Sequence, residues 1–283
     1  MTDAAAGNKA TPICWQAHRG GGAHEAPDNT MGANRYAWSL GGIPEADIRT
    51  TKDGIIVCLH DATPARTTTA PEAVKHLPIS EFTYEETRHW DAGVRFSEQF
   101  RGERIPTLAE LFAEMQGEPE RLVYLDLKDV NLEQLGALID EYGVNKQVIF
   151  AHNVQANCQS MKRIAAGVRS LLWIGGSPEQ IKQKYAIARE SGFAGLDQVQ
   201  FHIRTNADAK ADWPYVLDAA FLRDALAETA AAGVDLELFP FDIDAANIGL
   251  LLDIGIRWYA TDEPARFLDS VRLWQGRSGS GLA

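Results

Sequence analysis

The chain has few cysteines and no long apolar run. Three cysteines occur among its 283 residues, at positions 14, 58 and 158, and an odd number without paired spacing argues against a disulfide framework. Cys14 and Cys58 lie within apolar stretches, where cysteine is usually a small buried residue. No apolar run approaches the roughly 20 residues that a membrane-spanning helix needs, so we expect no stable membrane insertion.

Basic residues are also scarce. The chain has 27 Lys and Arg against 39 Asp and Glu, which gives a formal net charge of −12. This balance argues against a nucleic-acid partner and against binding to an anionic membrane surface. A small anionic substrate stays compatible with it, because a metal ion and a few local basic side chains can reverse the field inside a cleft. The oligomeric state is left open.

The start of the chain lacks the features of a targeting segment. Residues 1–10 contain neither the basic stretch nor the apolar stretch of a secretory signal peptide. The sequence therefore favours a cytoplasmic protein, unless a targeting segment precedes residue 1. We expect a flexible N-terminal tail over residues 1–10, a single domain over 11–275 and a flexible C-terminal tail over 276–283.

Two patterns alternate through the whole chain. Apolar, β-branched runs predict strands at residues 13–17, 44–50, 55–60, 122–127, 147–151, 170–174, 196–201, 235–239 and 257–260. Helical patterns lie between them, at residues 30–40, 107–115, 131–142, 153–166, 178–191 and 221–232. This alternation predicts parallel strands in an α/β fold. Nine strands without a dinucleotide-binding glycine fingerprint, in a chain near the roughly 250 residues of that fold, favour a TIM (β/α)8 barrel.

Residues 17–61 contain the densest set of reactive side chains. Glu45 and Asp47 are two residues apart on a predicted strand, so their side chains share one face. Two carboxylates on one face repel each other unless a positive charge lies between them. Hard divalent cations such as Mg²⁺ and Ca²⁺ prefer such oxygen ligands. The pair therefore indicates a metal site, and a solvated acidic pair on an edge strand is the alternative.

Two histidines stand on either side of this acidic pair. His18 and His60 each end an apolar run, and a histidine at the end of a buried strand is well placed for proton transfer. Arg19 adds a guanidinium suited to phosphate. A metal, two imidazoles and an arginine together are suited to cleaving a phosphoester. The alternative for each histidine is a core residue that donates to a backbone carbonyl.

The order of these motifs resembles the glycerophosphodiester phosphodiesterase family. The similar segments are H-R-G at 18–20, P-D-N-T at 27–30, E-A-D-I-R-T-T-K-D-G at 45–54, V-C-L-H-D at 57–61, R-T-T at 66–68, R-I-P-T-L at 104–108 and Y-L-D-L-K at 124–128. The resemblance thins after about residue 155. It implies a TIM barrel in which a divalent metal and a histidine pair hydrolyse glycerophosphodiesters to sn-glycerol 3-phosphate and an alcohol.

The resemblance also implies roles for single residues. Asp126 stands where the family usually has a glutamate as third metal ligand, so Glu45, Asp47 and Asp126 are the implied ligands of Mg²⁺ or Ca²⁺, with Mn²⁺ as a further candidate. Lys128 shares the face of Asp126 and fits as a cation that holds a phosphoryl oxygen. Glu25 lies near a family glutamate that touches the metal or the glycerol, so it is a candidate substrate contact.

Two aromatic side chains at strand ends complete the candidate site. Trp173 and His202 end predicted strands and are candidates for the wall of a substrate pocket, although a place in the core is commoner for such residues. The next strand reads E-L-F-P-F at 237–241, where the family often has W-T-V-N. The alternatives to the implied activity are a phospholipase D-like hydrolase of lysophospholipids and a non-catalytic barrel that binds a phosphorylated ligand.

Overall fold

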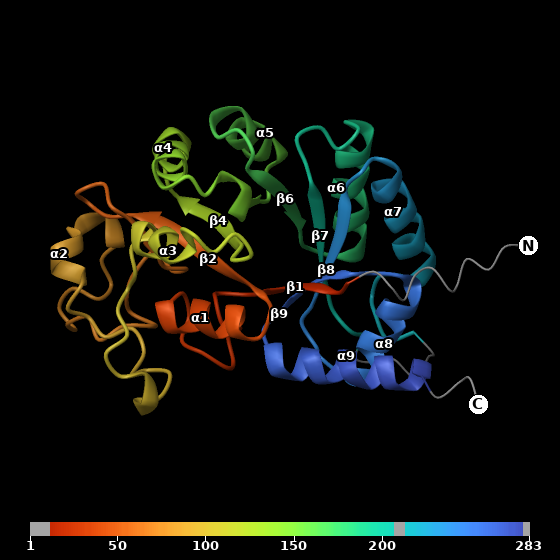
Figure 1. The fold of residues 1–283 in the computed structure, drawn as a ribbon, viewed down its shortest axis with the longest axis horizontal. Helices are drawn as coiled ribbons and strands as arrows, with labels where there is room; N and C mark the ends of the chain where they lie inside the picture. Colours follow the sequence, from red (N-terminus) through yellow and green to blue (C-terminus); the bar gives the residue numbers. More distant parts are fainter. Residues whose placement is uncertain (1–11, 207–212, 280–283) are drawn as a thin grey trace, which may run out of the picture.

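The computed structural model describes residues 12–206 and 213–279. Within these residues, eight parallel strands form a barrel: β1 (Cys14–Ala17), β2 (Ile43–Thr50), β4 (Val123–Asp129), β5 (Val148–His152), β6 (Arg169–Ile174), β7 (Gln198–Ile203), β8 (Asp235–Pro240) and β9 (Trp258–Thr261). β1 pairs with both β2 and β9, and this closes the barrel (Figure 1). The predicted TIM barrel is confirmed.

Helices follow most of the barrel strands. They are α1 (Met31–Ser39), α3 (Leu108–Met115), α4 (Leu132–Tyr142), α5 (Gln155–Ile164), α6 (Pro178–Glu190), α7 (Ala219–Ala231), α8 (Ala245–Ile254) and α9 (Pro264–Gly279), with a 3₁₀ turn η4 (Asn145–Gln147) before β5. Thr30, Thr107, Asn131 and Ser177 cap four of the predicted helices with their side chains. We did not predict α8 and α9. The run I-G-L-L-L in α8 is apolar on consecutive positions, so it lacks the helical period.

Side chains along β2 and β4 point alternately toward the helices and toward the barrel interior. Ala46, Ile48, Val123 and Leu125 pack in the large core that the helices cover. The residues between them point into the barrel interior or toward the carboxyl ends of the strands. The parallel register places Asp47 directly beside Asp126. The acidic residues of two strands are therefore neighbours in space although 79 positions of sequence separate them.

The strand predicted at 55–60 is not part of the barrel. β3 (Ile56–Cys58) pairs antiparallel with β2 on the outside. The segment after it contains η2 (Ile79–Glu81), α2 (Tyr84–Thr87) and η3 (Glu98–Phe100). This segment packs into a small core of its own and projects beside the barrel (Figure 1, left), with Val57, Leu59, Ile79, Phe82, Trp90 and Ile105 buried in it. His60 is thus carried by this projecting unit.

The end of the described chain differs from the expected boundary. α9 continues to Gly279, so residues 276–279, which we expected in a C-terminal tail, are helical. The expected N-terminal tail, residues 1–10, and residues 280–283 lie outside the described residues. No helix in the described ranges has both the length and the apolar character to cross a membrane. The division into one domain over 11–275 stays a prediction.

Candidate active site

A cavity of about 250 Å³ lies at the carboxyl ends of the barrel strands, where TIM barrels carry their active sites. Side chains from seven of the barrel strands, or from just after them, line it together with His60. They are Gln16, His18, Arg19, Glu45, His60, Asp126, Lys128, Ala151, Leu171, Trp173, Gln200, His202, Phe239 and Phe241. Of the predicted site residues, Asp47 lies behind this lining and Glu25 lies elsewhere in the described structure.

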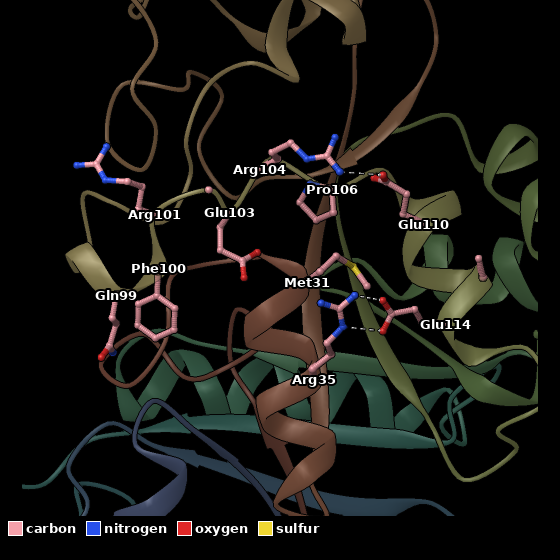
Figure 2. A pocket seen from close by; sticks show the side chains of 12 residues that line it. Met31, Arg35, Gln99, Phe100, Arg101, Glu103, Arg104, Pro106, Glu110 and Glu114 are labelled. Carbon is pink, nitrogen blue, oxygen red and sulfur yellow. Dashed lines mark hydrogen bonds and ion pairs between the residues drawn. The ribbon is translucent and has the colours of Figure 1, made fainter.

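A larger cavity, about 600 Å³, lies between α1, α3 and the segment 99–106 (Figure 2). Its arginines already have acidic partners: Arg35 forms a bidentate pair with Glu114, and Arg104 lies 3.7 Å from Glu110. None of the described residues in its lining is a histidine. Of these two cavities, only the smaller combines imidazoles, carboxylates and basic groups in its lining, so it is the candidate active site.

Three carboxylates gather at one side of the smaller cavity. One oxygen from each of Glu45, Asp47 and Asp126 lies within 4.8 Å of the other two. Lys128 Nζ is 3.0 Å from Asp47 Oδ1 and 2.7 Å from Asp126 Oδ2, so one ammonium faces three acids. Glu45 Oε2 accepts the backbone N–H of Arg19 at 2.7 Å, whereas the buried Glu45 Oε1 has no partner among the described residues. The excess negative charge and the unpaired oxygen fit a divalent cation.

The protonation of these acids follows from burial and from each other. Burial, and then the charges of Asp47 and Asp126, raise the pKa of Glu45 well above its ordinary value. Burial also acts to raise the pKa of Asp47, but Lys128 and His60 lower it by more. Burial raises the pKa of Asp126. Glu45 is therefore the acid that holds a proton most easily when no cation is bound, and metal binding at such a site releases that proton.

Asn29 holds Asp47 in place. Its Nδ2 donates to Asp47 Oδ2 at 2.8 Å, and the backbone N–H of Asp47 donates back to Asn29 Oδ1 at 2.8 Å. Asn29 has a φ of 58°, in the left-handed region that asparagine tolerates. The next residue, Thr30, caps α1 by accepting from the backbone N–H of Ala33. Both residue types are good caps, so the sequence could not separate the two roles.

Both predicted catalytic histidines have an aspartate partner at Nδ1. His18 Nδ1 is 2.7 Å from Oδ1 of Asp262, which follows β9, and His60 Nδ1 is 2.7 Å from Asp61 Oδ1. We assign Nδ1 as the protonated nitrogen in each ring, because a carboxylate can only accept there. Nε2 is then the atom left for the substrate. The Arg49 guanidinium donates to the backbone carbonyl of His60 at 2.8 and 3.0 Å and fixes its position.

A chain of ion pairs joins His60 to Arg19. Asp61 Oδ2 accepts from Arg66 at 2.6 Å, Arg66 reaches Asp28 at 2.8 Å, and Asp28 accepts from Arg19 at 2.9 Å. Burial acts to raise the pKa of Asp61, but the hydrogen bonds of Arg66 and His60 lower it to about 2. Asp61 is therefore ionised throughout the neutral range. We did not place it in the predicted catalytic set, and it is the group that orients His60.

Aromatic side chains also line the cavity. The His202 ring stacks on Trp173 with centroids 5.2 Å apart, and Trp173 Nε1 donates to Asp126 at 3.3 Å. Phe239 contacts His18 and His202 edge-on, at 5.0 and 5.4 Å between ring centroids. Burial, and then the charge of His18, lower the pKa of His202 to about 4. His202 is therefore neutral near pH 7 and belongs to the less polar side of the cavity.

The family model described as "Glycerophosphoryl diester phosphodiesterase family" matches residues 18–266 of this chain. The chain belongs to the glycerophosphoryl diester phosphodiesterase family. The match spans the barrel from His18 to α9, so it includes both histidines and all three carboxylates. The resemblance inferred from the motifs is confirmed, and with it the prediction that the chain is a phosphodiesterase of this family.

Known proteins match this phosphodiesterase over different shares of its length. A glycerophosphodiester phosphodiesterase of Caldanaerobacter subterraneus subsp. tengcongensis is 30% identical over 266 residues, which are 90% of this chain and 96% of the relative. Human glycerophosphodiester phosphodiesterase 1 is 42% identical over 101 residues, 35% of this chain and 29% of its own. A solved phosphodiesterase from Oleispira antarctica shares the fold with a TM-score of 0.69 at 20% identity, over 94% of this chain and 99% of that one.

Glu25, predicted as a candidate substrate contact, lies outside the cavity lining. Its carboxylate accepts from the Tyr36 hydroxyl at 2.7 Å and from the backbone N–H of Ala265, in the first turn of α9, at 3.0 and 3.1 Å. A carboxylate is favourable at a helix N-terminus, where backbone N–H groups lack partners. Glu25 therefore fastens α9 to the loop after β1 and does not line the cavity.

Proposed function

We propose that this phosphodiesterase hydrolyses glycerophosphodiesters to sn-glycerol 3-phosphate and an alcohol. The observation that carries the proposal is that His18 and His60, each bound to an aspartate at Nδ1, line the same cavity as Arg19 and Lys128. Two proton-transfer groups and two cations for a phosphate are thus within one small space. The Oleispira antarctica enzyme, which has the same fold, was solved in complex with the product sn-glycerol-3-phosphate, and this supports the choice of substrate.

Glu45, Asp47 and Asp126 would hold a divalent metal ion, Mg²⁺ or Ca²⁺, with Mn²⁺ as a further candidate. When bound, such an ion supplies Lewis-acid polarisation of a phosphoryl oxygen. The unpartnered Glu45 Oε1 and the charge imbalance around Lys128 support this assignment. Asp126 is shorter than the glutamate usual in the family, but its register beside Asp47 brings its oxygens into the cluster.

The two histidines transfer the protons in this proposal. One imidazole takes a proton from the attacking hydroxyl, which belongs to water or to the substrate itself, and the other gives a proton to the leaving alkoxide at Nε2. The acid ring starts as an imidazolium and becomes neutral, and the base ring becomes an imidazolium. Asp262 and Asp61 each stabilise the positive form of the ring that they contact. Each ring changes its protonation once per cleavage, so both must keep an aspartate partner.

Arg19 and Lys128 neutralise the phosphate. Arg19 Nε is a buried donor without a partner among the described residues, so it has a hydrogen bond left to make. The Lys128 ammonium stands at the carboxylate cluster and can contact a phosphoryl oxygen at its edge. Trp173 and His202 would pack against the substrate's carbon atoms. The partner is a small phosphodiester, no nucleic acid is expected, and a cytoplasmic location stays a prediction from the sequence.

The test is hydrolysis of glycerophosphocholine by the purified protein, followed by release of glycerol 3-phosphate. EDTA should abolish the activity, and Mg²⁺, Ca²⁺ or Mn²⁺ should restore it. His18→Ala and Glu45→Ala should each lose at least a hundredfold in kcat. His89→Ala is the matched control, because His89 is exposed on the projecting unit. Activity confined to a lysophospholipid would favour the phospholipase D-like alternative, and a folded protein inactive on every diester would contradict the proposal.

A further inference from the structure

Glu237 lies in the barrel interior beneath the active-site cavity. It stands in the middle of β8, and its side chain has no exposure to solvent. Its carboxylate contacts Gln200 of β7 and Tyr124 of β4, which is on the opposite side of the barrel. No ion pair reaches Glu237 among the described residues. A buried acid without a cation requires a physical account, because an unpaired charge in such a place is strongly unfavourable.

The hydrogen bonds on the upper side of Glu237 fix the orientation of Gln200. Gln200 Nε2 donates to Glu237 Oε1 at 2.9 Å and to Gln16 Oε1 at 3.2 Å, so both of its hydrogens are used. Gln200 Oε1 must then face His202, whose Nε2 is 2.9 Å away. An amide oxygen only accepts, so His202 carries its proton on Nε2. Nδ1 of this ring is the unprotonated nitrogen.

The hydrogen bonds on the lower side indicate the protonation of Glu237 itself. The Tyr124 hydroxyl has one proton but lies near two oxygens, Gln198 Oε1 at 2.9 Å and Glu237 Oε2 at 3.2 Å. If Glu237 is protonated, it donates to Tyr124, and Tyr124 donates to Gln198. If the Gln198 amide is reversed instead, Tyr124 can donate to an ionised Glu237. That arrangement leaves a full charge in the barrel interior, so the neutral acid is favoured.

We propose that Glu237 is a positioning residue that acts as a neutral carboxylic acid: it locks the Gln200 amide, which in turn holds His202 as a neutral, Nε2-protonated ring against Trp173. Trp173 stacks on His202 and donates a hydrogen bond to Asp126, so these contacts connect Glu237 in the barrel interior to the carboxylate cluster. The part of this inference that concerns substrate packing on His202 rests on the proposed function. The proton on Glu237 and the form of the His202 ring do not.

The surroundings of Glu237 agree with a neutral acid. Burial raises its pKa to about 7, although its contacts with Gln200 and Tyr124 act against this. The charged and titratable groups nearest to it are Tyr124 on β4, Arg169 on β6, Asp235 on β8 and Cys14 on β1. Arg169 is 3.3 Å from Asp235, so their charges largely offset each other at Glu237.

The sign of the pH effect follows from this raised pKa. The folded protein binds the Glu237 proton more tightly than the unfolded chain does, between the ordinary value of 4.5 and about 7. The stabilisation is complete below pH 4.5 and is lost as the pH rises to about 7. At pH 8 the wild-type protein therefore contains a buried charge that a neutral side chain would not have.

The decisive variant is Glu237→Gln. An amide at this position can accept from Gln200 through Oε1 and donate to Tyr124 through Nε2, as the acid does, but it cannot ionise. We expect its thermal midpoint to equal that of the wild-type protein at pH 5 and to exceed it by several degrees at pH 8. Glu237→Leu leaves Gln200 and Tyr124 without their partner. It should raise KM for glycerophosphocholine severalfold more than it lowers kcat, and Glu237→Gln should restore KM.

Nitrogen NMR of ¹⁵N-histidine-labelled protein supplies a readout that does not depend on activity. His202 should show the Nε2-protonated neutral form down to pH 5 in the wild-type protein and in Glu237→Gln, and a mixture of forms in Glu237→Leu. A Glu237→Gln protein less stable than wild type at pH 8, or a His202 ring protonated on Nδ1, would overturn the inference. If the protein is inactive on diesters but gives the expected stability and NMR results, the inferred protonation of Glu237 and His202 is supported and only the proposed function is refuted.

Discussion

Asn29 offers the sharpest test of how the carboxylate cluster is held. We propose to replace it with glycine, which accepts the φ of 58° without strain and removes only the side chain. Asp47 then loses the donor to Oδ2, and its backbone N–H loses its acceptor. The change touches neither a metal ligand nor a histidine, so any effect on the metal must pass through the position of Asp47.

The size of the effect can be worked out from these two hydrogen bonds. A hydrogen bond to a charged group contributes about 1.5–3 kcal/mol, and a buried donor left without a partner costs about 1–3 kcal/mol. Both groups are buried, so we expect the free energy of unfolding to fall by about 3 kcal/mol or more. Loss of a residue that orients a metal ligand typically weakens metal binding by about 10–100-fold.

The assay is calorimetric titration of the purified protein with Mn²⁺, alongside urea unfolding. Thr30→Ala is the matched control, because Thr30 is the adjacent buried residue and caps α1 without contacting Asp47. It should lower the free energy of unfolding by about 1 kcal/mol. Its Kd for Mn²⁺ should stay at the wild-type value. If Asn29→Gly and Thr30→Ala bind Mn²⁺ equally tightly, Asn29 does not organise the cluster and our reasoning is wrong.

Three further outcomes are expected. Ionised Asp61, with its pKa of about 2, contributes stability that the wild-type protein loses as the pH falls from about 4 to 2. In Asp61→Asn the free energy of unfolding should therefore fall less over this pH range. Urea unfolding at several pH values between 4 and 2 measures it. Glu25→Gln should lower the free energy of unfolding by about 0.3–1 kcal/mol and leave kcat/KM within twofold, whereas a large loss of activity would restore its predicted substrate role. Metal at 100 times the Kd of the wild-type protein should stabilise the EDTA-treated wild-type protein by about 2.7 kcal/mol in thermal unfolding. A similar gain in Glu45→Gln at the same metal concentration would contradict the ligand assignment.

The fold was largely readable from the sequence because its signals are local. Eight of the nine predicted strands are barrel strands, and each of the six predicted helices begins within two residues of its expected start. Residues 55–60 also have a strand pattern, but the pattern does not state which strand they pair with or in which direction. Helix α8 was missed because it is apolar on consecutive positions.

The site was readable only where its residues carry motifs. We predicted His18, His60 and Glu45 from strand ends and a two-residue spacing, and Asp126 from the resemblance to the family. The structure brings these four side chains to one cavity. The partner of His18 could not be predicted in this way, because Asp262 is 244 positions away and reaches it only through the pairing of β1 with β9. The contact of Glu25 with Ala265 could not be predicted either, because nothing local shows that the N-terminus of α9 lies beside it.

The contact between His18 and Asp262 has a consequence for the life of the newly made chain. Asp262 follows His18 by 244 positions, so it leaves the ribosome long after His18 does. Every earlier strand can pair with its neighbour while synthesis continues, but β1 gains its second neighbour only when β9 arrives. A nascent or cut chain that lacks residue 262 therefore contains most of the proposed catalytic side chains and still has an unsupported His18. The proposed site becomes complete only when residue 262 has been made, in a step that also completes the barrel.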